Sequence, residues 1–265
     1  MNAWIWNGTT FKENASLPVE DRGFRYGMAL FESLRVWHSV PLFLEKHLAR
    51  LRHACAERGF PVEDGALTQV DGLLRKAGTD GFARIYVTAG DGTAFDPARS
   101  CRILVLLENR EPPIPGPCKI LIAPEPHRPL FGGLKTANYW GNLDALQRAM
   151  RDGMNEALLF NDQAELISAC MANVFVINRS TIRTPALACG ARDGVTRAWV
   201  LDQMKVKQGS LFVEDLQTAD EIILTNSWFG LRSVTHLGGR KLPSTSVCDG
   251  LLAAYERAIA ESKGH

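Results

Sequence analysis

The stretch Glu111-Pro-Pro-Ile-Pro-Gly-Pro117 decides how this chain is divided. Proline has no backbone N–H and a fixed φ, so the stretch cannot pair in a sheet or continue a helix. Proline-rich segments act as extended spacers. We therefore expect an interdomain linker at residues 114–117, between a smaller N-terminal α/β domain at residues 1–113 and a larger C-terminal domain at residues 118–265.

Strand-like and helix-like patterns alternate on the N-terminal side of the linker. Leu44, Leu48, Leu51 and Cys55 recur at helical spacing, which predicts an amphipathic helix over residues 46–58. Short apolar runs bounded by turn residues predict strands at residues 3–6, on either side of a turn at His38-Ser39, at 84–88 and at 102–107.

The C-terminal side follows the same pattern. Its apolar runs and helical periodicity predict strands at 118–123, 156–160, 173–177 and 221–225, and helices at 142–153, 194–205 and 249–262. No internal repeat is visible in the sequence. The predicted fold class is therefore α+β, with two α/β domains whose sheets are largely antiparallel or mixed.

The composition is close to the average for globular proteins, with 46% hydrophobic and 22% charged residues. The 30 basic residues are balanced by 29 acidic ones. Binding to the phosphate backbone of a nucleic acid needs an excess of positive charge. No nucleic-acid partner is therefore expected.

The cysteines indicate reduced thiols rather than disulfides or a metal site. They are scattered, form no Cys-x-x-Cys pair and have no histidine at metal-ligand spacing. The N-terminus lacks the pattern of a signal peptide, and no run approaches the roughly 20 apolar residues of a membrane span. We expect a cytoplasmic protein with no membrane association and no metal.

Lys135 is the first candidate for chemistry. It lies in Gly132-Gly-Leu-Lys-Thr-Ala-Asn138, a flexible turn, and is followed by Tyr139 and Trp140, which can shield it from water. Most lysines are solvated, so a surface role is one interpretation. The other is a desolvated amine, because loss of solvation favours the neutral, nucleophilic form of a lysine.

Eight segments of the chain resemble those of one enzyme family, in the same order. They are Asp21-Arg-Gly-Phe24 with Tyr26-Gly27 and Phe31-Glu32, His47-Leu-Ala-Arg-Leu51, Arg84 to Thr88 with Gly90, Lys135-Thr-Ala-Asn-Tyr139, Asn155-Glu-Ala-Leu-Leu159, Ala172-Asn-Val-Phe175, Gly194-Val-Thr-Arg197 and Glu221 to Ser227. The family comprises the fold-type IV enzymes that use pyridoxal 5'-phosphate (PLP), the class IV aminotransferases. It includes branched-chain and D-amino acid aminotransferases and aminodeoxychorismate lyases. Leu224-Thr-Asn-Ser227 is more similar to the lyase branch.

This resemblance implies a D-amino acid aminotransferase-like PLP fold, with a C-terminal PLP-binding domain, a small amino substrate and a homodimer with shared active sites. It implies that Lys135 is the catalytic residue, which holds PLP as a Schiff base and relays protons. It also implies that Arg50 binds the cofactor phosphate. From the helical pattern alone, Arg50 is a helix-surface arginine.

The start of the predicted helix after Asp193 is a candidate anion site. Its first backbone N–H groups, on Val195 and Thr196, and the threonine hydroxyl can bind a phosphate. An ordinary helix cap by Asp193 is the alternative, and both can hold. At the end of a strand, Asn226 and Ser227 can donate to the phosphate or the substrate, or can simply form a turn.

Three places depart from the family pattern, and one of them is Met28-Ala29, where members often have Asp-Gly. Ser168 replaces the carboxylate that pairs with the pyridine nitrogen of PLP, and the resemblance still places it against the cofactor. Glu165 lies three residues earlier, so it shares the face of Ser168 only if the strand contains a bulge. Ala89 stands where an arginine often precedes Gly90 and binds the substrate carboxylate.

The resemblance leaves the reaction open between transamination and an aminodeoxychorismate-lyase-like cleavage. Ser168 favours a second class of function, a PLP-binding protein with weak or lost catalysis in a regulatory role. Retention of Lys135 argues against that class, because a pure scaffold needs no amine there. A cofactor-free small-molecule binder is the third class.

Overall fold

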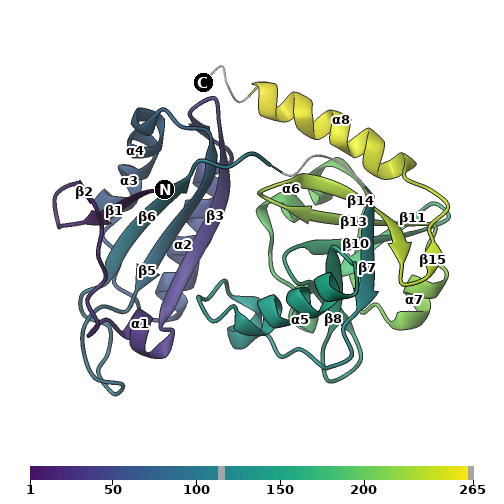
Figure 1. The fold of residues 1–265 in the computed structure, drawn as a ribbon, viewed down its shortest axis with the longest axis horizontal. Helices are drawn as coiled ribbons and strands as arrows, with labels where there is room; N and C mark the ends of the chain where they lie inside the picture. The colour runs from purple at the N-terminus through teal and green to yellow at the C-terminus, as the bar shows by residue number, and fades with distance from the viewer. Residues whose placement is uncertain (113–116, 262–265) are drawn as a thin grey trace. The chain divides into compact units, whose positions relative to one another are not determined.

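The computed structural model describes residues 1–112 and 117–261 (Figure 1). Within these ranges the chain divides into two units. Unit 1 holds residues 1–112 together with Lys135–Asn138, and unit 2 holds the rest of the described chain. The expected linker at 114–117 lies outside the described residues except for Pro117, so the predicted domain boundary stays a prediction.

The sheet of unit 1 runs in the order β2-β1-β6-β5-β3-β4, and its ladders are antiparallel. Its strands are β1 (Asn2–Trp6), β2 (Phe11–Glu13), β3 (Ala29–Trp37), β4 (Val40–Pro41), β5 (Gly81–Thr88) and β6 (Arg102–Glu108). His38 and Ser39 between β3 and β4 have positive φ angles of 49° and 62°, as a tight hairpin turn requires. The strands expected in this half of the chain are thereby confirmed.

The helices of unit 1 are α1 (Arg22–Tyr26), α2 (Leu44–Glu57), α3 (Asp64–Thr68) and α4 (Val70–Ala77). α2 packs against β3, and α4 packs against β4. Leu48, Leu51 and Cys55 of α2 are each 1% exposed, so the helical spacing in the sequence marks the buried face. The helix expected at 46–58 is confirmed, with its ends shifted by one or two residues.

The sheet of unit 2 runs in the order β12-β11-β10-β13-β14-β7-β8-β9, with β15 beside β14. Its strands are β7 (Cys118–Ile122), β8 (Glu156–Phe160), β9 (Leu166–Ala169), β10 (Asn173–Asn178), β11 (Thr181–Pro185), β12 (Val206–Gly209), β13 (Glu221–Asn226), β14 (Gly230–Leu237) and β15 (Arg240–Lys241). β7 runs parallel to β14 and β8, and β11 runs parallel to β12, whereas the other ladders are antiparallel. The expected α+β class with antiparallel and mixed sheets is confirmed.

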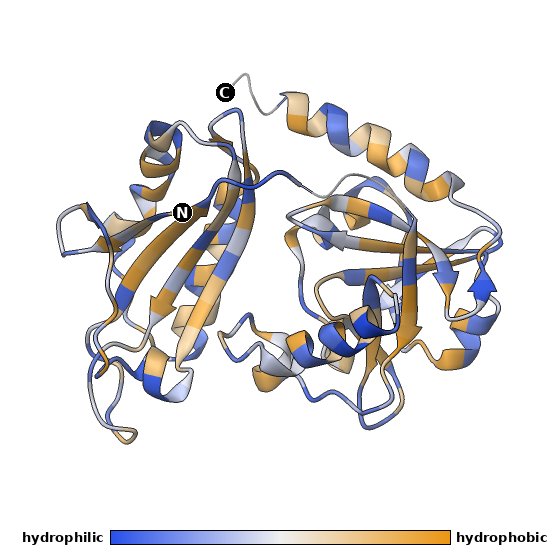
Figure 2. Ribbon diagram, viewed as in Figure 1, coloured by the Kyte–Doolittle hydropathy of each residue, from blue (hydrophilic) through white to orange (hydrophobic). Residues whose placement is uncertain are grey.

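The helices of unit 2 are α5 (Trp140–Arg151), α6 (Val195–Gln203), α7 (Val213–Gln217) and α8 (Ser246–Glu261), with 3-10 turns at Leu130–Gly133 and Leu187–Cys189. They pack against β8, β13, β10 and β14 respectively. Hydrophobic and hydrophilic bands alternate along α8 (Figure 2), and Leu251, Tyr255 and Ile259 form its buried side. The three helices expected here are confirmed, although residue 262 lies outside the described chain.

β9 contains a β-bulge. Two neighbouring residues of β8 pair with Ser168 and Leu166, so Ile167 is the extra residue. Leu166 and Ala169 belong to one hydrophobic core, although in a regular strand residues three apart point to opposite faces. The bulge therefore shifts the alternation of faces by one residue at Ile167.

A helix that crosses a membrane needs about 20 apolar residues. Every helix described above is too short or too polar for that. In residues 1–112 and 117–261, no three His, Cys, Asp or Glu side chains gather as a metal site requires. The six cysteines are unpaired thiols, and five of them are buried.

Candidate active site

The main chain of Lys135 is attached to β3. The N–H of Phe31 donates to the Lys135 carbonyl at 2.9 Å, and the N–H of Ala137 donates to the Ala29 carbonyl at 2.9 Å. A single antiparallel bridge lies between these two hydrogen bonds. β3 therefore fixes the position of the lysine backbone within unit 1.

The Lys135 side chain is half-buried over an aromatic ring. Its Nζ lies 4.1 Å from the centroid of the Phe31 ring, and that ring stacks on Tyr86 at 5.2 Å. Contact with an aromatic face replaces part of the water around an amine. Trp140, which follows Lys135 by five residues, is 84% exposed.

Arg50 and Glu32 form a bidentate ion pair in unit 1. Arg50 Nε donates to Glu32 Oε1 at 2.7 Å, and Arg50 Nη2 donates to Glu32 Oε2 at 2.6 Å. Glu32 lies on β3 and is 1% exposed, whereas the Arg50 side chain is 20% exposed. Leu48 and Leu51 are buried, so Arg50 lies on the flank of α2. Its role in binding a phosphate stays a prediction.

His47 gives Glu32 a second buried partner, with Nδ1 at 2.7 Å from Glu32 Oε2. Burial raises the pKa of the Glu32 carboxyl, but the Arg50 charge and the hydrogen bonds hold that pKa below its ordinary value. Burial lowers the pKa of His47, so the ring is neutral at pH 7 and donates from Nδ1. Among the described residues, His47 Nε2 has no hydrogen-bond partner.

The start of α6 offers hydrogen-bond donors to an anion. α6 begins at Val195, and its N-cap residue Gly194 has no side chain that could bond the first backbone N–H groups. The first N–H groups of a helix have no partner within the helix and can bind an anion. Thr196 is 2% exposed, and its hydroxyl has no partner in the part of the chain that is described. The Asp193 carboxylate lies 3.7 Å from the Arg197 guanidinium. Capping by Asp193 and binding of an anion both stay predictions for the start of α6.

Gly194 is required by a close approach. A Cβ on Gly194 would lie 2.0 Å from Asn173 Oδ1. The Asn173 amide also donates to the carbonyl of Arg192 at 2.8 Å. β10 therefore holds the loop before α6, and a larger residue at position 194 would displace the start of the helix.

Ser168 lies half-buried on β9, next to the bulge at Ile167. The strand therefore contains the bulge that a role for Glu165 in place of Ser168 requires, and Glu165 itself lies just before the strand. The Glu165 carboxylate accepts from Asn161 Nδ2 at 2.8 Å and from the Ser210 hydroxyl. The bond from Ser210, followed by that from Asn161, lowers the pKa of Glu165, so it is ionised at pH 7. The roles of Ser168 and Glu165 toward a cofactor stay predictions.

Asn226 forms the turn after β13. Its Oδ1 accepts from the N–H groups of Trp228 at 3.0 Å and Phe229 at 2.9 Å, and its Nδ2 donates to the Met171 carbonyl at 3.1 Å. The turn interpretation is therefore confirmed for Asn226. Ser227 lies half-buried in the same turn. Donation from either residue to a phosphate or substrate stays a prediction.

Arg192 connects three segments of unit 2. Its Nη1 donates to the Tyr139 hydroxyl at 2.7 Å, and its Nε donates to the Gly133 carbonyl at 3.2 Å. Gly133 and Tyr139 lie on either side of Lys135 in the sequence. One side chain thus attaches the loop before α6 to both flanks of the lysine segment. The sequence carries no sign of this role, because Arg192 lies in an irregular loop.

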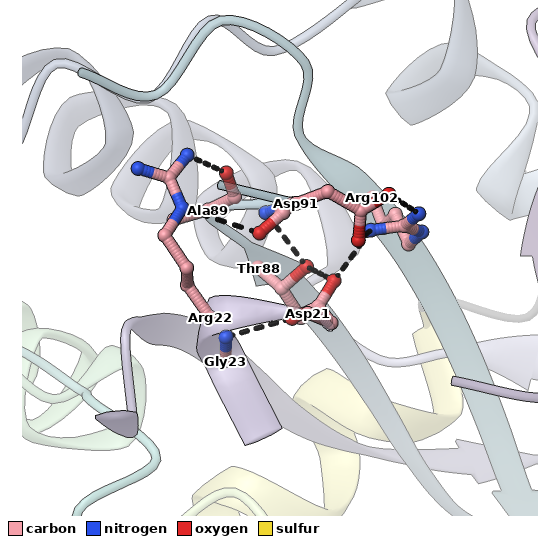
Figure 3. A network of polar contacts seen from close by, with 8 residues as sticks. Asp21, Arg22, Gly23, Thr88, Ala89, Asp91 and Arg102 are labelled. Carbon is pink, nitrogen blue, oxygen red and sulfur yellow. Dashed lines mark hydrogen bonds and ion pairs between the residues drawn. The ribbon is translucent and has the colours of Figure 1, made fainter. Parts of the chain in front are cut away.

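Asp21 and Arg22 form a buried polar network in unit 1 (Figure 3). Asp21 accepts hydrogen bonds from three residues on three segments: Gly23, Thr88 and Arg102. The Arg22 guanidinium donates to backbone carbonyls of the loop after β5, those of Ala89, Gly90 and Asp96. This motif therefore fastens α1 to the loop in which Ala89 replaces the family arginine.

Residues 29–237 of the chain match the family model described as amino-transferase class IV. An aminodeoxychorismate lyase from Bacillus subtilis is 27% identical over 83% of this chain and 82% of that protein. The solved structure of 4-amino-4-deoxychorismate lyase from Pseudomonas aeruginosa is 28% identical, with a TM-score of 0.86 over 95% of this chain and 97% of that one. A PLP-bound aminotransferase from Brucella abortus is 22% identical, with a TM-score of 0.84 over 97% and 99%.

The chain belongs to the class IV aminotransferase family, because the matched residues cover most of its length. The resemblance, the assignment as a PLP-dependent enzyme and PLP as the cofactor are thereby confirmed. The side chains present fit this cofactor. Unit 1 carries an amine on Lys135, the group that an aldehyde needs, and unit 2 carries the Thr196 hydroxyl at the start of α6, a donor of the kind that a phosphate accepts.

Proposed function

We propose that the chain is an aminotransferase or an aminodeoxychorismate-lyase-like enzyme that acts on a small amino substrate through a Schiff base between Lys135 and PLP. The observation that carries the proposal is the half-buried Lys135 amine, 4.1 Å from the Phe31 ring centroid, on a backbone held by β3. Bound PLP supplies an electron-withdrawing ring that weakens the bonds at the α-carbon of a substrate.

Each candidate residue has a proposed role. By the family resemblance, the Lys135 amine would hold the cofactor at its aldehyde and would hold and return a proton at Nζ. Arg50, the N–H groups of Val195 and Thr196 and the Thr196 hydroxyl would bind the phosphate. Ser168 would be the residue nearest the pyridine nitrogen. Further donors to phosphate or substrate come from Asn226 and Ser227.

Two observations favour the lyase-like reaction, although relatives of both kinds match most of the chain. The two lyases named above are 27% and 28% identical to this chain. The turn sequence Leu224-Thr-Asn-Ser227 favours the same branch.

One observation favours the alternative, a PLP-binding protein with weak or lost catalysis in a regulatory role. Ser168 has a neutral hydroxyl where the family has a carboxylate. A hydroxyl cannot stabilise a protonated pyridine nitrogen as a carboxylate does. The half-buried Lys135 supports catalysis over this alternative.

The proposal includes a cytoplasmic homodimer. Six thiols without a disulfide suit a reducing compartment. The dimer follows from the family resemblance, in which active sites are shared between subunits. Light scattering on the purified protein tests it, and a monomer at working concentration would count against a shared site.

An activity panel tests the reaction. We expect pyruvate from aminodeoxychorismate without an acceptor, whereas a transaminase would need a 2-oxo acid to convert L- or D-amino acids. Lys135→Ala should abolish both activities and the visible absorbance of bound PLP. Lys119→Ala, at an exposed lysine on β7, is the matched control. A protein that binds PLP but gives no product in either assay would support the regulatory alternative.

A further inference from the structure

We propose that Glu32 is a positioning residue, whose buried carboxylate orients the Arg50 guanidinium for the phosphate of PLP. The inference rests on the proposed function of Arg50. It assigns a role to Glu32, to which the proposed function gives none.

The ion pair between Glu32 and Arg50 fixes the orientation of the Arg50 guanidinium as well as its distance from the carboxylate. Glu32 accepts from Nε and Nη2 of Arg50 at 2.7 and 2.6 Å, so it holds one edge of the planar guanidinium. A bidentate pair fixes the plane of an arginine, which a single contact does not. The Arg50 side chain is 20% exposed on the flank of α2, where a long side chain otherwise samples many rotamers.

The carboxylate is itself held in place. Glu32 is 1% exposed, and the fully buried His47 contacts its Oε2 from Nδ1 at 2.7 Å. The neutral histidine uses its Nδ1–H for this bond and adds no charge that competes with Arg50. Glu32 therefore lies between two partners from the same helix, α2, and cannot follow Arg50 if the arginine moves.

The neighbouring residue on β3 holds the other predicted cofactor group. Phe31 donates from its N–H to the Lys135 carbonyl at 2.9 Å. Consecutive residues of one strand thus hold the lysine proposed to bind the aldehyde and the arginine proposed to bind the phosphate. A small cofactor that reaches both Lys135 and Arg50 needs a constant distance between these two side chains. Attachment of both residues to β3 keeps that distance constant.

If Glu32 acts only through its negative charge, the expected effect of its removal on phosphate binding has the opposite sign. A carboxylate beside Arg50 repels an incoming phosphate, so its removal should strengthen phosphate binding if Glu32 acts only through its charge. If Glu32 orients Arg50, its removal should weaken phosphate binding. The two explanations differ in the sign of one measured change.

The experiment titrates the apoprotein with PLP and with pyridoxal, which lacks the phosphate, and follows the absorbance of the bound cofactor. The proteins are wild type, Glu32→Gln, Arg50→Ala and the double variant. Glu108→Gln is the control, because Glu108 also pairs with an arginine, Arg84, on the same sheet. Circular dichroism checks that each variant is folded.

We expect Glu32→Gln to weaken PLP binding at least tenfold and to leave pyridoxal binding within twofold. It should have no further effect in the Arg50→Ala background, and Glu108→Gln should bind PLP as wild type does. Unchanged or tighter PLP binding by Glu32→Gln would overturn the proposal, and so would an equal loss for both ligands.

A second variant covers the case in which Glu32→Gln does not fold. Glu32→Asp keeps the charge but shortens the side chain, so weaker PLP binding supports positioning, and wild-type binding overturns it. If the proposed function is wrong, the wild-type protein binds neither PLP nor pyridoxal at Lys135. That result differs from a loss confined to Glu32→Gln, and it would overturn both proposals.

Discussion

Phe31 contacts Lys135 twice: its N–H donates to the lysine carbonyl at 2.9 Å, and its ring centroid lies 4.1 Å from the lysine Nζ. The first contact fixes the lysine main chain, and the second limits where the amine points. The two contacts can be separated, because only the second depends on the side chain of residue 31.

Phe31→Leu removes the ring and keeps the main-chain hydrogen bond. Loss of the stacked pair with Tyr86 should lower the free energy of unfolding by about 1 kcal/mol, measured by urea denaturation. Borohydride reduction of the PLP-loaded variant should still label Lys135, because its backbone stays attached to β3. Mass spectrometry that finds the label on another lysine would contradict this attachment.

Thr196→Val should separate stability from cofactor binding. The buried hydroxyl has no partner in the described chain, so its removal should leave the apoprotein as stable or slightly more stable. PLP affinity should fall about tenfold, as for the loss of one hydrogen bond to a charged group.

The matched control for Thr196→Val is Thr184→Val. Thr184 is also buried, but its hydroxyl donates to the Val174 carbonyl at 2.7 Å. This variant should lose about 1–3 kcal/mol of stability, because a buried carbonyl is left unsatisfied, and should keep its PLP affinity. The same pattern of change in both variants would mean that Thr196 does not face a phosphate.

Ser168→Glu should restore the carboxylate that the family carries. A charge-assisted bond to the pyridine nitrogen is worth about 1.5–3 kcal/mol, so conversion of an amine substrate should be about ten- to a hundredfold faster in single-turnover kinetics. Nitrogen NMR of bound PLP should show a neutral ring in wild type. A ring that is already protonated would indicate that Glu165, which lies just before β9, or another acid supplies the charge.

Glu156→Gln should remove a pH dependence of stability. Glu156 is 5% exposed, and burial raises the pKa of its carboxyl to about 7, although N–H groups of Met171 and Ala157 donate to it. A raised folded-state pKa gives stability that is fully present below the ordinary value of 4.5 and lost as the pH rises through 7.

Between about pH 4 and pH 8, the free energy of unfolding of wild type should fall by about 3 kcal/mol more than that of Glu156→Gln, at about 1.36 kcal/mol per pKa unit. Urea denaturation at several pH values measures the difference, and parallel curves for the two proteins would refute the assignment.

Much of the fold follows from the sequence, because burial of one face imposes a period on the longer elements. α2, β5 and β6 each carry several periods of buried residues and were predicted within a few residues. β12 has 4 residues and is not among the predicted strands, because one or two alternations do not stand out from a loop.

Motifs in the sequence mark Lys135 and Arg50 as candidates, and their roles toward the cofactor stay predictions. The sequence does not show the side chains that contact the candidate residues, because these contacts join positions far apart in the chain. Arg192 bonds to Tyr139 across 53 residues. The bulge at Ile167 was stated only as a condition, because it depends on the pairing of β9 with β8 and not on composition.

The placement of Lys135–Asn138 in unit 1 has a consequence for how the chain is made. The beginning of β3 is synthesised long before the segment that pairs with it, and a ribosome adds only about 5–20 residues per second. For several seconds the nascent unit therefore carries an exposed strand edge, a surface prone to aggregation and to capture by chaperones. A gene truncated before Lys135 would make that exposure permanent, so we expect the N-terminal half to be insoluble when expressed alone.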